Sequence, residues 1–483
     1  MPNKISILHI SDLHKDSDIS YDNLYQSLID DCDNYTLKGS IKKPHIIVVS
    51  GDLIKGGSQD EIKKQYACVN EFLNKLVEYF LDNDKTRIII VPGNHDIDWT
   101  ASKESMDRVT LDGNEEKKQS TIKENVKNFF LKKSNIRWSW NELCFYEIKD
   151  ANRYNERFAL FSEFYNTFYE NIRNYSINPQ EQFQIHDIPQ FGITFVAFNS
   201  CYNNDHLNLS GEINPDCISR ASTELKKFYN LGRLLVSIWH HNTIGLPHEN
   251  NYMDKRILRS MIDKHIQIGL HGHHHMCQAT HEYKSVFDDN DRLLILSAGT
   301  LYGNHDSLPN GTKRQYNIIE IGFDFDNNSV KLIVHSREDK SSAEYDIPSW
   351  GDGRIDDSSY SSWTTKLNLP PQPSIENIMD SIMEETEKRN DISWGIKQLL
   401  NLDTNNSFVR KILLDYLERK QDYNLIFEQF RNPQTNEEAI LLINAVIELN
   451  EVVKIREIAG NSFIKNNQDA SIKQLFQQIK LKL

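Results

Sequence analysis

The first hundred residues alternate short apolar runs with longer amphipathic ones, and this alternation restricts the fold more than any other feature. The apolar runs lie at 4–10, 45–50 and 87–92, and each has the length of a buried strand. Between them, residues 21–32 and 59–81 repeat apolar side chains three and four positions apart, as helices packed on a sheet do. This strand–helix–strand–helix–strand order predicts an α/β domain with a parallel core sheet.

The rest of the chain divides into segments of different character. Residues 99–190 are charged, aromatic and mostly helical in pattern, and we interpret them as an insertion over one end of the sheet. Strand-like runs return at 192–200, 233–239, 266–270, 292–299, 316–324 and 330–336. Residues 341–374 are rich in Ser, Asp, Gly and Pro, which predicts a linker or irregular arm. We therefore expect one domain at 1–340 and an all-helical module at 375–483.

Composition limits the possible partners and the compartment. The 483 residues include 55 Lys and Arg against 69 Asp and Glu, a net charge of −14. This balance argues against a surface built as a whole to neutralise long nucleic acid, and it leaves a local basic patch possible. The six cysteines form no CxxC pair, so neither a disulfide framework nor a thiolate zinc site is expected. The start resembles no signal peptide and no apolar run reaches ~18 residues, so we expect a cytoplasmic protein without membrane contact.

Short polar strings follow five of the predicted strands. They are SDLH at 11–14, SGDL at 50–53, PGNHD at 92–96, WHHN at 239–242 and HGHHH at 271–275. Functional groups of open parallel sheets gather at the carboxyl ends of strands, so all five strings should arrive at one edge. In extended backbone, residues i and i+2 project to the same side, which would place Asp12 beside His14 and His273 beside His275. Glycines within the strings permit the tight turns that such a cluster needs.

The strings supply a set of candidate metal ligands. These are Asp12, His14, Asp52, Asn94, His240, His273 and His275. Carboxylate, imidazole and amide oxygen donors without a thiolate favour Mn²⁺ first, then Fe, Zn²⁺ or Ni²⁺, whereas the number of imidazoles disfavours Mg²⁺ and Ca²⁺. Seven ligands are too many for one ion. We therefore expect two divalent transition-metal ions that share Asp52.

The charge of such a centre indicates its chemistry. Two divalent ions supply about +4, Asp12 and Asp52 about −2, and a bridging hydroxide about −1, leaving roughly +1 to meet an anion. A metal pair of this kind activates water and clamps the attacking and leaving oxygens of an in-line displacement at phosphorus, so a phosphate ester is the expected substrate. His95 is placed to protonate the leaving oxygen or to bind phosphate, with Asp96 fixing its tautomer.

In this order, DLH, GD, GNHD, a later histidine and GHxH resemble the calcineurin-like metallophosphoesterase superfamily over about residues 4–340. The resemblance implies an α/β/β/α sandwich of two mixed sheets and a dinuclear site. It assigns two ligand sets, Asp12, His14, Asp52 and His275, and Asp52, Asn94, His240 and His273. Many members have proline two positions after the ligand histidine, where this chain has Asn242, so His241 stays open as an alternative to His240. Many also have Asp where this chain has Lys55.

Some of these residues also have simpler interpretations. Taken singly, Asp12 and Asp52 could cap helices, and Asn94 could occupy a turn with positive φ. His241 and His271 are expected beside the ligands rather than among them. A second GNHD at 303–306 lacks a preceding apolar strand, and we interpret it as coincidence, with substrate contact as the alternative.

The expected function is hydrolysis of a phosphodiester, in a nucleotide, a cyclic nucleotide or a nucleic acid, by attack of a metal-bridging hydroxide. Alternatives are a DNA or RNA nuclease of a bacterial defence or repair complex, a phosphomonoesterase, and a scaffold whose helical tail binds a partner. A solvated helix face is the preferred interpretation of the basic residues in segment 117–140. Because aromatic residues are interleaved with them, a nucleic-acid substrate stays open as the alternative. The module at 375–483 is the expected site of a protein partner or of self-association.

Overall fold

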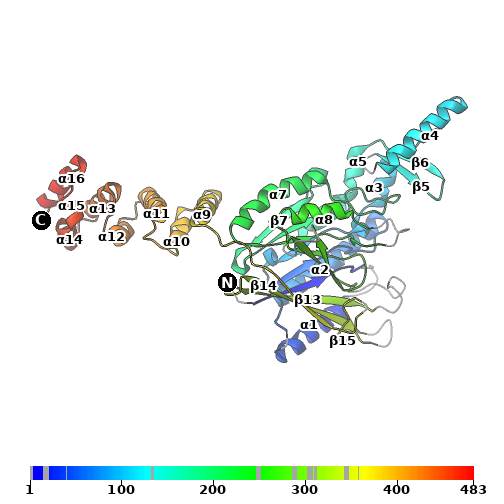
Figure 1. The fold of residues 1–483 in the computed structure, drawn as a ribbon, viewed down its shortest axis with the longest axis horizontal. Helices are drawn as coiled ribbons and strands as arrows, with labels where there is room; N and C mark the ends of the chain where they lie inside the picture. The colour runs from blue at the N-terminus through cyan, green and yellow to red at the C-terminus, as the bar shows by residue number, and fades with distance from the viewer. Residues whose placement is uncertain are drawn as a thin grey trace. The chain divides into compact units, whose positions relative to one another are not determined.

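The computed structural model describes residues 4–14, 21–39, 41–131, 135–245, 252–284, 291–301, 308, 313–341, 347–356 and 358–483. The chain forms two compact units, Met1–Pro371 and Gln372–Leu483, which are described separately (Figure 1). The second GNHD, at 303–306, lies outside the described residues. Within the described residues, no helix is both long enough and apolar enough to cross a membrane.

The first sheet contains the predicted parallel core. Its strand order is β15-β14-β13-β1-β2-β3, and β16 also pairs with β14. The strands are β1 (Lys4–Ile10), β2 (Ile46–Val49), β3 (Ile88–Ile90), β13 (Gln315–Asp324), β14 (Ser329–Asp339), β15 (Trp350–Asp352) and β16 (Ser362–Asn368). β1, β2 and β3 are parallel, whereas β13 pairs with β1 in the antiparallel sense. The carboxyl ends of the three parallel strands therefore lie side by side.

The second sheet is also mixed. Its order is β11-β12-β10-β9-β8-β7. The strands are β7 (Phe183–Ile188), β8 (Ile193–Phe198), β9 (Leu234–Ile238), β10 (Ile268–His271), β11 (Gln278–Tyr283) and β12 (Arg292–Ser297). The four inner strands run parallel, and the two edge strands are antiparallel to their neighbours.

The two sheets face each other across an apolar layer, and helices cover their outer faces (Figure 1). Alternation along β1 shows why: Ile5 and Ile7 enter the layer between the sheets, while Leu8 and Ile10 face the helices. The helices on the first sheet are α1 (Asp22–Leu37), α2 (Gln59–Leu81) and α6 (Ala159–Phe168). Those on the second are α7 (Pro215–Asn230) and α8 (Lys255–Ile262). The α/β/β/α sandwich of two mixed sheets is confirmed.

The insertion contains strands as well as the expected helices. It comprises α3 (Trp99–Glu104), β4 (Met106–Arg108), α4 (Glu115–Phe130), β5 (Ile136–Ser139), β6 (Cys144–Ile148), α5 (Ala151–Asn155), the 3-10 helix η3 (Glu156–Phe158) and α6. β4, β6 and β5 form a separate three-stranded sheet, and β7 already belongs to the second main sheet. These strands were not expected, because they are three to six residues long and partly polar, with too few apolar positions to show a period of two.

Residues 341–374, expected as a linker or irregular arm, contain two strands, so the expectation is wrong for part of the segment. β15 and β16 both pair with β14 and extend the first sheet. β16 is an edge strand in which only Leu367 is buried, so its sequence lacks the apolar alternation of a buried strand.

The second unit is entirely helical. Its helices are α9 (Ile375–Arg389), α10 (Ile392–Leu399), α11 (Ser407–Lys420), α12 (Tyr423–Phe430), α13 (Asn436–Leu449), α14 (Val452–Gly460), α15 (Ser462–Lys465) and α16 (Ala470–Leu481). α9, α11 and α13 each end at a left-handed residue that is followed by an acidic N-cap and a shorter helix. The order of a long helix followed by a shorter one therefore occurs three times between α9 and α14. A buried, two-pronged ion pair between Arg410 and Glu438 joins α11 to α13.

Candidate metal centre

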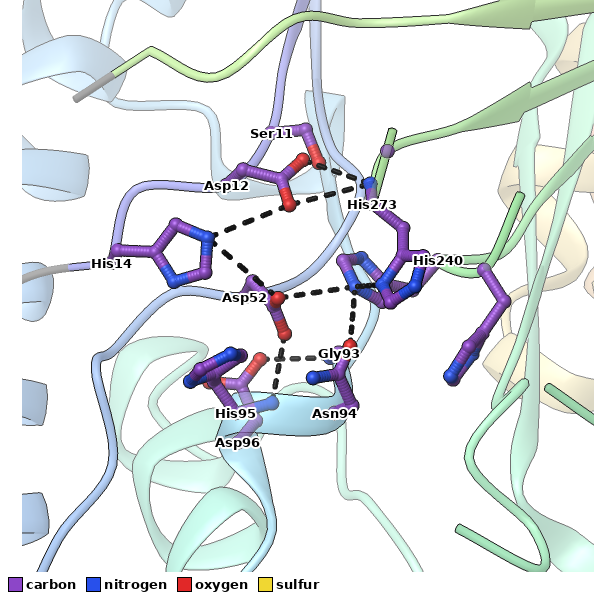
Figure 2. Close-up of polar contacts among 12 residues, drawn as sticks. Ser11, Asp12, His14, Asp52, Gly93, Asn94, His95, Asp96, His240 and His273 are labelled. Atoms are coloured by element: carbon purple, nitrogen blue, oxygen red, sulfur yellow. Dashed lines mark hydrogen bonds and ion pairs between the residues drawn. The ribbon is translucent and has the colours of Figure 1, made fainter. Parts of the chain in front are cut away.

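The predicted ligands come together where the carboxyl ends of five strands meet. Asp12, Asp52 and Asn94 follow β1, β2 and β3 of the first sheet. His240 and His273 follow β9 and β10 of the second sheet, so the cluster spans both halves of the sandwich (Figure 2). All seven predicted ligands belong to this cluster, even though residues 12 and 275 are separated by most of the domain.

The donor atoms form groups that share neighbours. Asp12, His14 and His275 place one donor each within 4.8 Å of one another, and so do Asp52, His240 and His273. His14 connects the two groups, because its Nε2 atom lies 3.7 Å from Asp12 Oδ1 and 3.8 Å from Asp52 Oδ2. A third combination at the same spacing joins His14 and Asp52 to His95, which was not predicted as a ligand.

The orientation of the rings fits cations at this position. The Nε2 atoms of His14 and His275 face each other at 3.2 Å, and His240 Nε2 faces His273 Nδ1 at 3.2 Å. Two neutral imidazoles that point lone pairs at each other repel, whereas a cation is attracted to both. His240 Nε2 also lies 3.2 Å from Asp52 Oδ2 and 3.1 Å from Asn94 Oδ1. The residues present therefore fit a metal centre of nitrogen and oxygen donors.

The backbone that presents these side chains is strained. Asp12, His14, Asp52, His273 and His275 have φ values of 54°, 41°, 52°, 69° and 58°. Non-glycine residues in this left-handed region are uncommon, and they concentrate at functional sites. The expected geometry, in which positions i and i+2 of an extended backbone project to the same side, was wrong, because the strands end before these residues. The side chains meet through left-handed turns instead.

Two glycines allow the turns to approach the neighbouring ligand side chains closely. A Cβ added to Gly93 would overlap the Asp52 carboxylate, and one added to Gly272 would overlap the side chains of Ser11 and Asp12. Neither position can accept a side chain without displacing a predicted ligand.

The structure distinguishes His240 from its neighbour His241. His240 Nδ1 lies 2.8 Å from the carbonyl oxygen of Ser50 and must donate to it, which leaves Nε2 free to face the cluster. The His241 ring is directed elsewhere, with Nδ1 2.9 Å from Ser200 Oγ and Nε2 3.3 Å from Asn204 Nδ2. His271 also turns away, toward the carbonyl of Gly272.

Asp96 does not fix the tautomer of His95, so that part of the prediction was wrong. Its carboxylate accepts hydrogen bonds from the backbone nitrogens of Leu53 and Gly93 and from the Tyr66 hydroxyl. His95 Nδ1 instead lies 3.0 Å from the carbonyl oxygen of Lys55. Asp96 thus ties the SGDL and GNHD loops together. The nearest acceptor for the His95 ring is a main-chain carbonyl, which no side-chain motif could reveal.

The helix-cap and turn alternatives also fail. The N-caps of α1 and α2 are Tyr21 and Ser58 rather than Asp12 or Asp52. Asn94 begins a short 3-10 helix, η2 (Asn94–Asp96), and its φ is not positive.

Electrostatics keep most of the ligands in the forms that bind cations. His240 is the exception: burial lowers its pKa, but the neighbouring Asp52 outweighs burial and raises this pKa to about 9, so a cation must displace a proton from the ring. Burial lowers the pKa of His14 to about 4 and that of His273 to about 3, so both rings are neutral at pH 7. Burial raises the pKa of the Asp12 carboxyl, but the neighbouring His275 and His240 outweigh it and hold this pKa below its usual value. For Asp52, the surrounding imidazoles likewise outweigh burial, and the carboxyl stays ionised. Anionic carboxylates and neutral imidazoles are the states required of metal ligands.

An α/β/β/α sandwich with carboxylate, amide and imidazole donors at the strand ends defines the class of metal-dependent phosphoesterases. The model of the calcineurin-like phosphoesterase family matches residues 5–277, which is more than half of the chain. The chain belongs to this family, as its motifs predicted. The family uses a dimetal centre.

Solved structures that match the chain include a dimetal phosphatase from Danio rerio, which is 9% identical with a TM-score of 0.35 and aligns over 69% of this chain and 96% of that one. Vps29 from Chaetomium thermophilum is 9% identical with a TM-score of 0.25, over 76% of this chain and 100% of that one. No curated protein sequence matches the chain. The family assignment therefore rests on the family model.

Proposed function

We propose that the protein hydrolyses a phosphodiester with two divalent transition-metal ions, of which Mn²⁺ is the first candidate. The observation that carries the proposal is the convergence of two donor groups on one shared carboxylate, that of Asp52. In this proposal the first ion is bound by Asp12, His14, Asp52 and His275. The second is bound by Asp52, Asn94, His240 and His273.

The chain's own residues supply position and charge. Bound cations would activate water and stabilise both oxygens of an in-line displacement at phosphorus. Asp12 and Asp52 neutralise part of the cationic charge, and the remaining positive charge attracts an anionic phosphate ester. Because His95 Nδ1 donates to the Lys55 carbonyl, Nε2 is the atom through which His95 binds a phosphate oxygen or holds the proton for the leaving group.

The test compares bis(p-nitrophenyl) phosphate with p-nitrophenyl phosphate in Mn²⁺, Ni²⁺, Zn²⁺ and Mg²⁺. We expect faster hydrolysis of the diester, dependent on a transition metal and abolished by a chelator. His275→Ala should remove the activity, whereas His274→Ala, its matched control one position away, should retain it. Equal rates for His275→Ala and wild type would refute the proposal, and faster hydrolysis of the monoester would make the protein a phosphomonoesterase.

A nucleic-acid substrate remains the second candidate, and segment 117–140 is the observation that favours it. Trp140 is 74% exposed beside Trp138, as a base-stacking platform requires. Against it, Arg137 is buried in an ion pair with Asp205 and cannot contact phosphate. Rates on linear DNA, circular DNA, RNA and cyclic nucleotides decide between these substrates. A Trp140→Ala variant that loses activity on polynucleotides alone would support this one.

The helical unit and the compartment complete the proposal. We propose that residues 375–483 bind a protein partner or a second copy of the chain, which size-exclusion and pull-down comparisons with and without this unit would test. The free state of all six cysteines supports a reducing compartment, and we propose the cytoplasm.

A further inference from the structure

The loop that follows β8 supports the two histidines of the WHHN string. We call residues 199–208 the support loop. Within it, Ser200 Oγ lies 3.1 Å from the backbone nitrogen of His240 and 3.1 Å from that of His241. The same oxygen lies 2.9 Å from His241 Nδ1. One buried hydroxyl thus contacts the main chain of a proposed metal ligand and the ring next to it.

Hydrogen-bond accounting fixes the direction of these contacts. Both backbone N–H groups can only donate, so they occupy the two lone pairs of Ser200 Oγ. The hydroxyl proton is then left for His241 Nδ1, which makes Nδ1 an acceptor and places the ring proton on Nε2. This Nε2 faces the Asn204 amide, whose oxygen has no other partner and accepts the proton when the amide is turned. His241 is therefore a neutral ring held at both nitrogens by the support loop.

The His241 ring also contacts His273, another of the proposed metal ligands. The centroids of His241 and His273 are 4.8 Å apart at an interplanar angle of 38°, and those of His241 and His240 are 5.4 Å apart. A displacement of the support loop would move His240 through its backbone and His273 through this ring contact.

The insertion fixes the support loop in turn. Asp205 accepts hydrogen bonds from Arg137 Nε of β5 at 2.7 Å and from the Tyr154 hydroxyl of α5 at 2.8 Å. Arg157 of η3 donates to the carbonyl oxygens of Tyr202 and, at 3.2 Å, Asn204. These side chains are all buried. Desolvated charges with such partners hold a loop in one position, because leaving any of them unpaired is costly.

We propose that Ser200 and Asp205 are positioning residues, through which the insertion sets His240 and His273 for cation binding. The inference rests on the proposed metal-binding function. It assigns the insertion a role at the metal centre that does not depend on the substrate. Binding of the cation held by Asp52, Asn94, His240 and His273 should be affected, and binding of the one held by Asp12, His14, Asp52 and His275 should not.

The test is titration calorimetry of Mn²⁺ into the metal-free full-length protein. Ser200→Ala removes one oxygen, and Asp205→Asn removes the charge that pairs with Arg137. We expect each substitution to lower the affinity for one of the two cations by about 10- to 100-fold, the usual effect of losing a residue that orients a ligand. The affinity for the other cation should stay unchanged. Asp31→Asn is the matched control, since Asp31 is equally buried and paired with Arg337 on the far face of the first sheet.

The possible outcomes distinguish a failure of the positioning role from a failure of the proposed metal-binding function. Wild-type affinity for both cations in folded Ser200→Ala or Asp205→Asn would overturn the inference, and so would equal weakening by Asp31→Asn. Thermal melts of the metal-free variants establish that they are folded. If the wild type itself binds no cation, the proposed function fails rather than the positioning role alone.

Discussion

Replacement of Asp52 by Asn is the most direct test of a carboxylate shared by two cations. Asp52 has a φ of 52°, and Asn tolerates this left-handed conformation better than Ala does. Asn also keeps the oxygen that accepts the backbone N–H of His95, and its shape fits against Gly93. The substitution therefore removes the charge and replaces Oδ2, the oxygen that faces His240, by an amide NH2 group, while the rest of the loop keeps its contacts.

The structure gives the scale of the loss. We take 3.2 Å, the distance from Asp52 Oδ2 to His240 Nε2, as the separation between the carboxylate and a cation. At such a separation and an effective dielectric constant of ~20, unit charges of opposite sign attract by about 5 kcal/mol. Each 1.36 kcal/mol is about tenfold in rate, so this energy corresponds to between three and four powers of ten. Because the amide oxygen can still bind a cation weakly, we expect a loss of roughly 10³-fold in kcat/KM.

The assay is hydrolysis of bis(p-nitrophenyl) phosphate with saturating Mn²⁺, together with a thermal melt of the metal-free protein. The melting temperature should stay close to that of the wild type. Asp98→Asn is the control, since Asp98 is a buried N-cap of α3 and Asn caps helices equally well. A folded Asp52→Asn variant with activity within about tenfold of wild type would refute the shared-carboxylate reasoning.

Three further predictions concern packing and metal content. Gly93→Ala should lower the rate of hydrolysis at least 100-fold, since the new methyl group would overlap the Asp52 carboxylate. Gly460→Ala is the control: open space surrounds this position, so the substitution should leave activity unchanged and stabilise its helix by up to about 1 kcal/mol. Arg410→Leu leaves Glu438 buried and unpaired and should destabilise the helical unit by about 3–5 kcal/mol in denaturant titrations, without changing kcat. Dialysis against a chelator should abolish hydrolysis and lower the melting temperature, and Mn²⁺ should restore both; a chelated enzyme that keeps its rate would contradict a metal-dependent mechanism.

The sequence by itself determined the parts of this protein that local patterns encode. Apolar runs with polar strings directly behind them specified the parallel strands and the edge where the donors gather. The residue types in these strings predicted a metal centre of nitrogen and oxygen donors. The glycines of GNHD and GHHH also signalled close approach, because a Cβ at Gly93 or Gly272 cannot fit beside the ligand carboxylates.

Tertiary structure decided what depends on contacts between distant segments. His240 faces the cluster rather than His241 because Ser50, 190 residues away in sequence, accepts its Nδ1 proton. Asp96 contacts Leu53 and Tyr66 instead of its neighbour His95, and β16 becomes a strand only by pairing with β14. A local pattern records the preference of a segment, whereas the direction of a ring or the pairing of an edge strand is set by groups that only folding brings near.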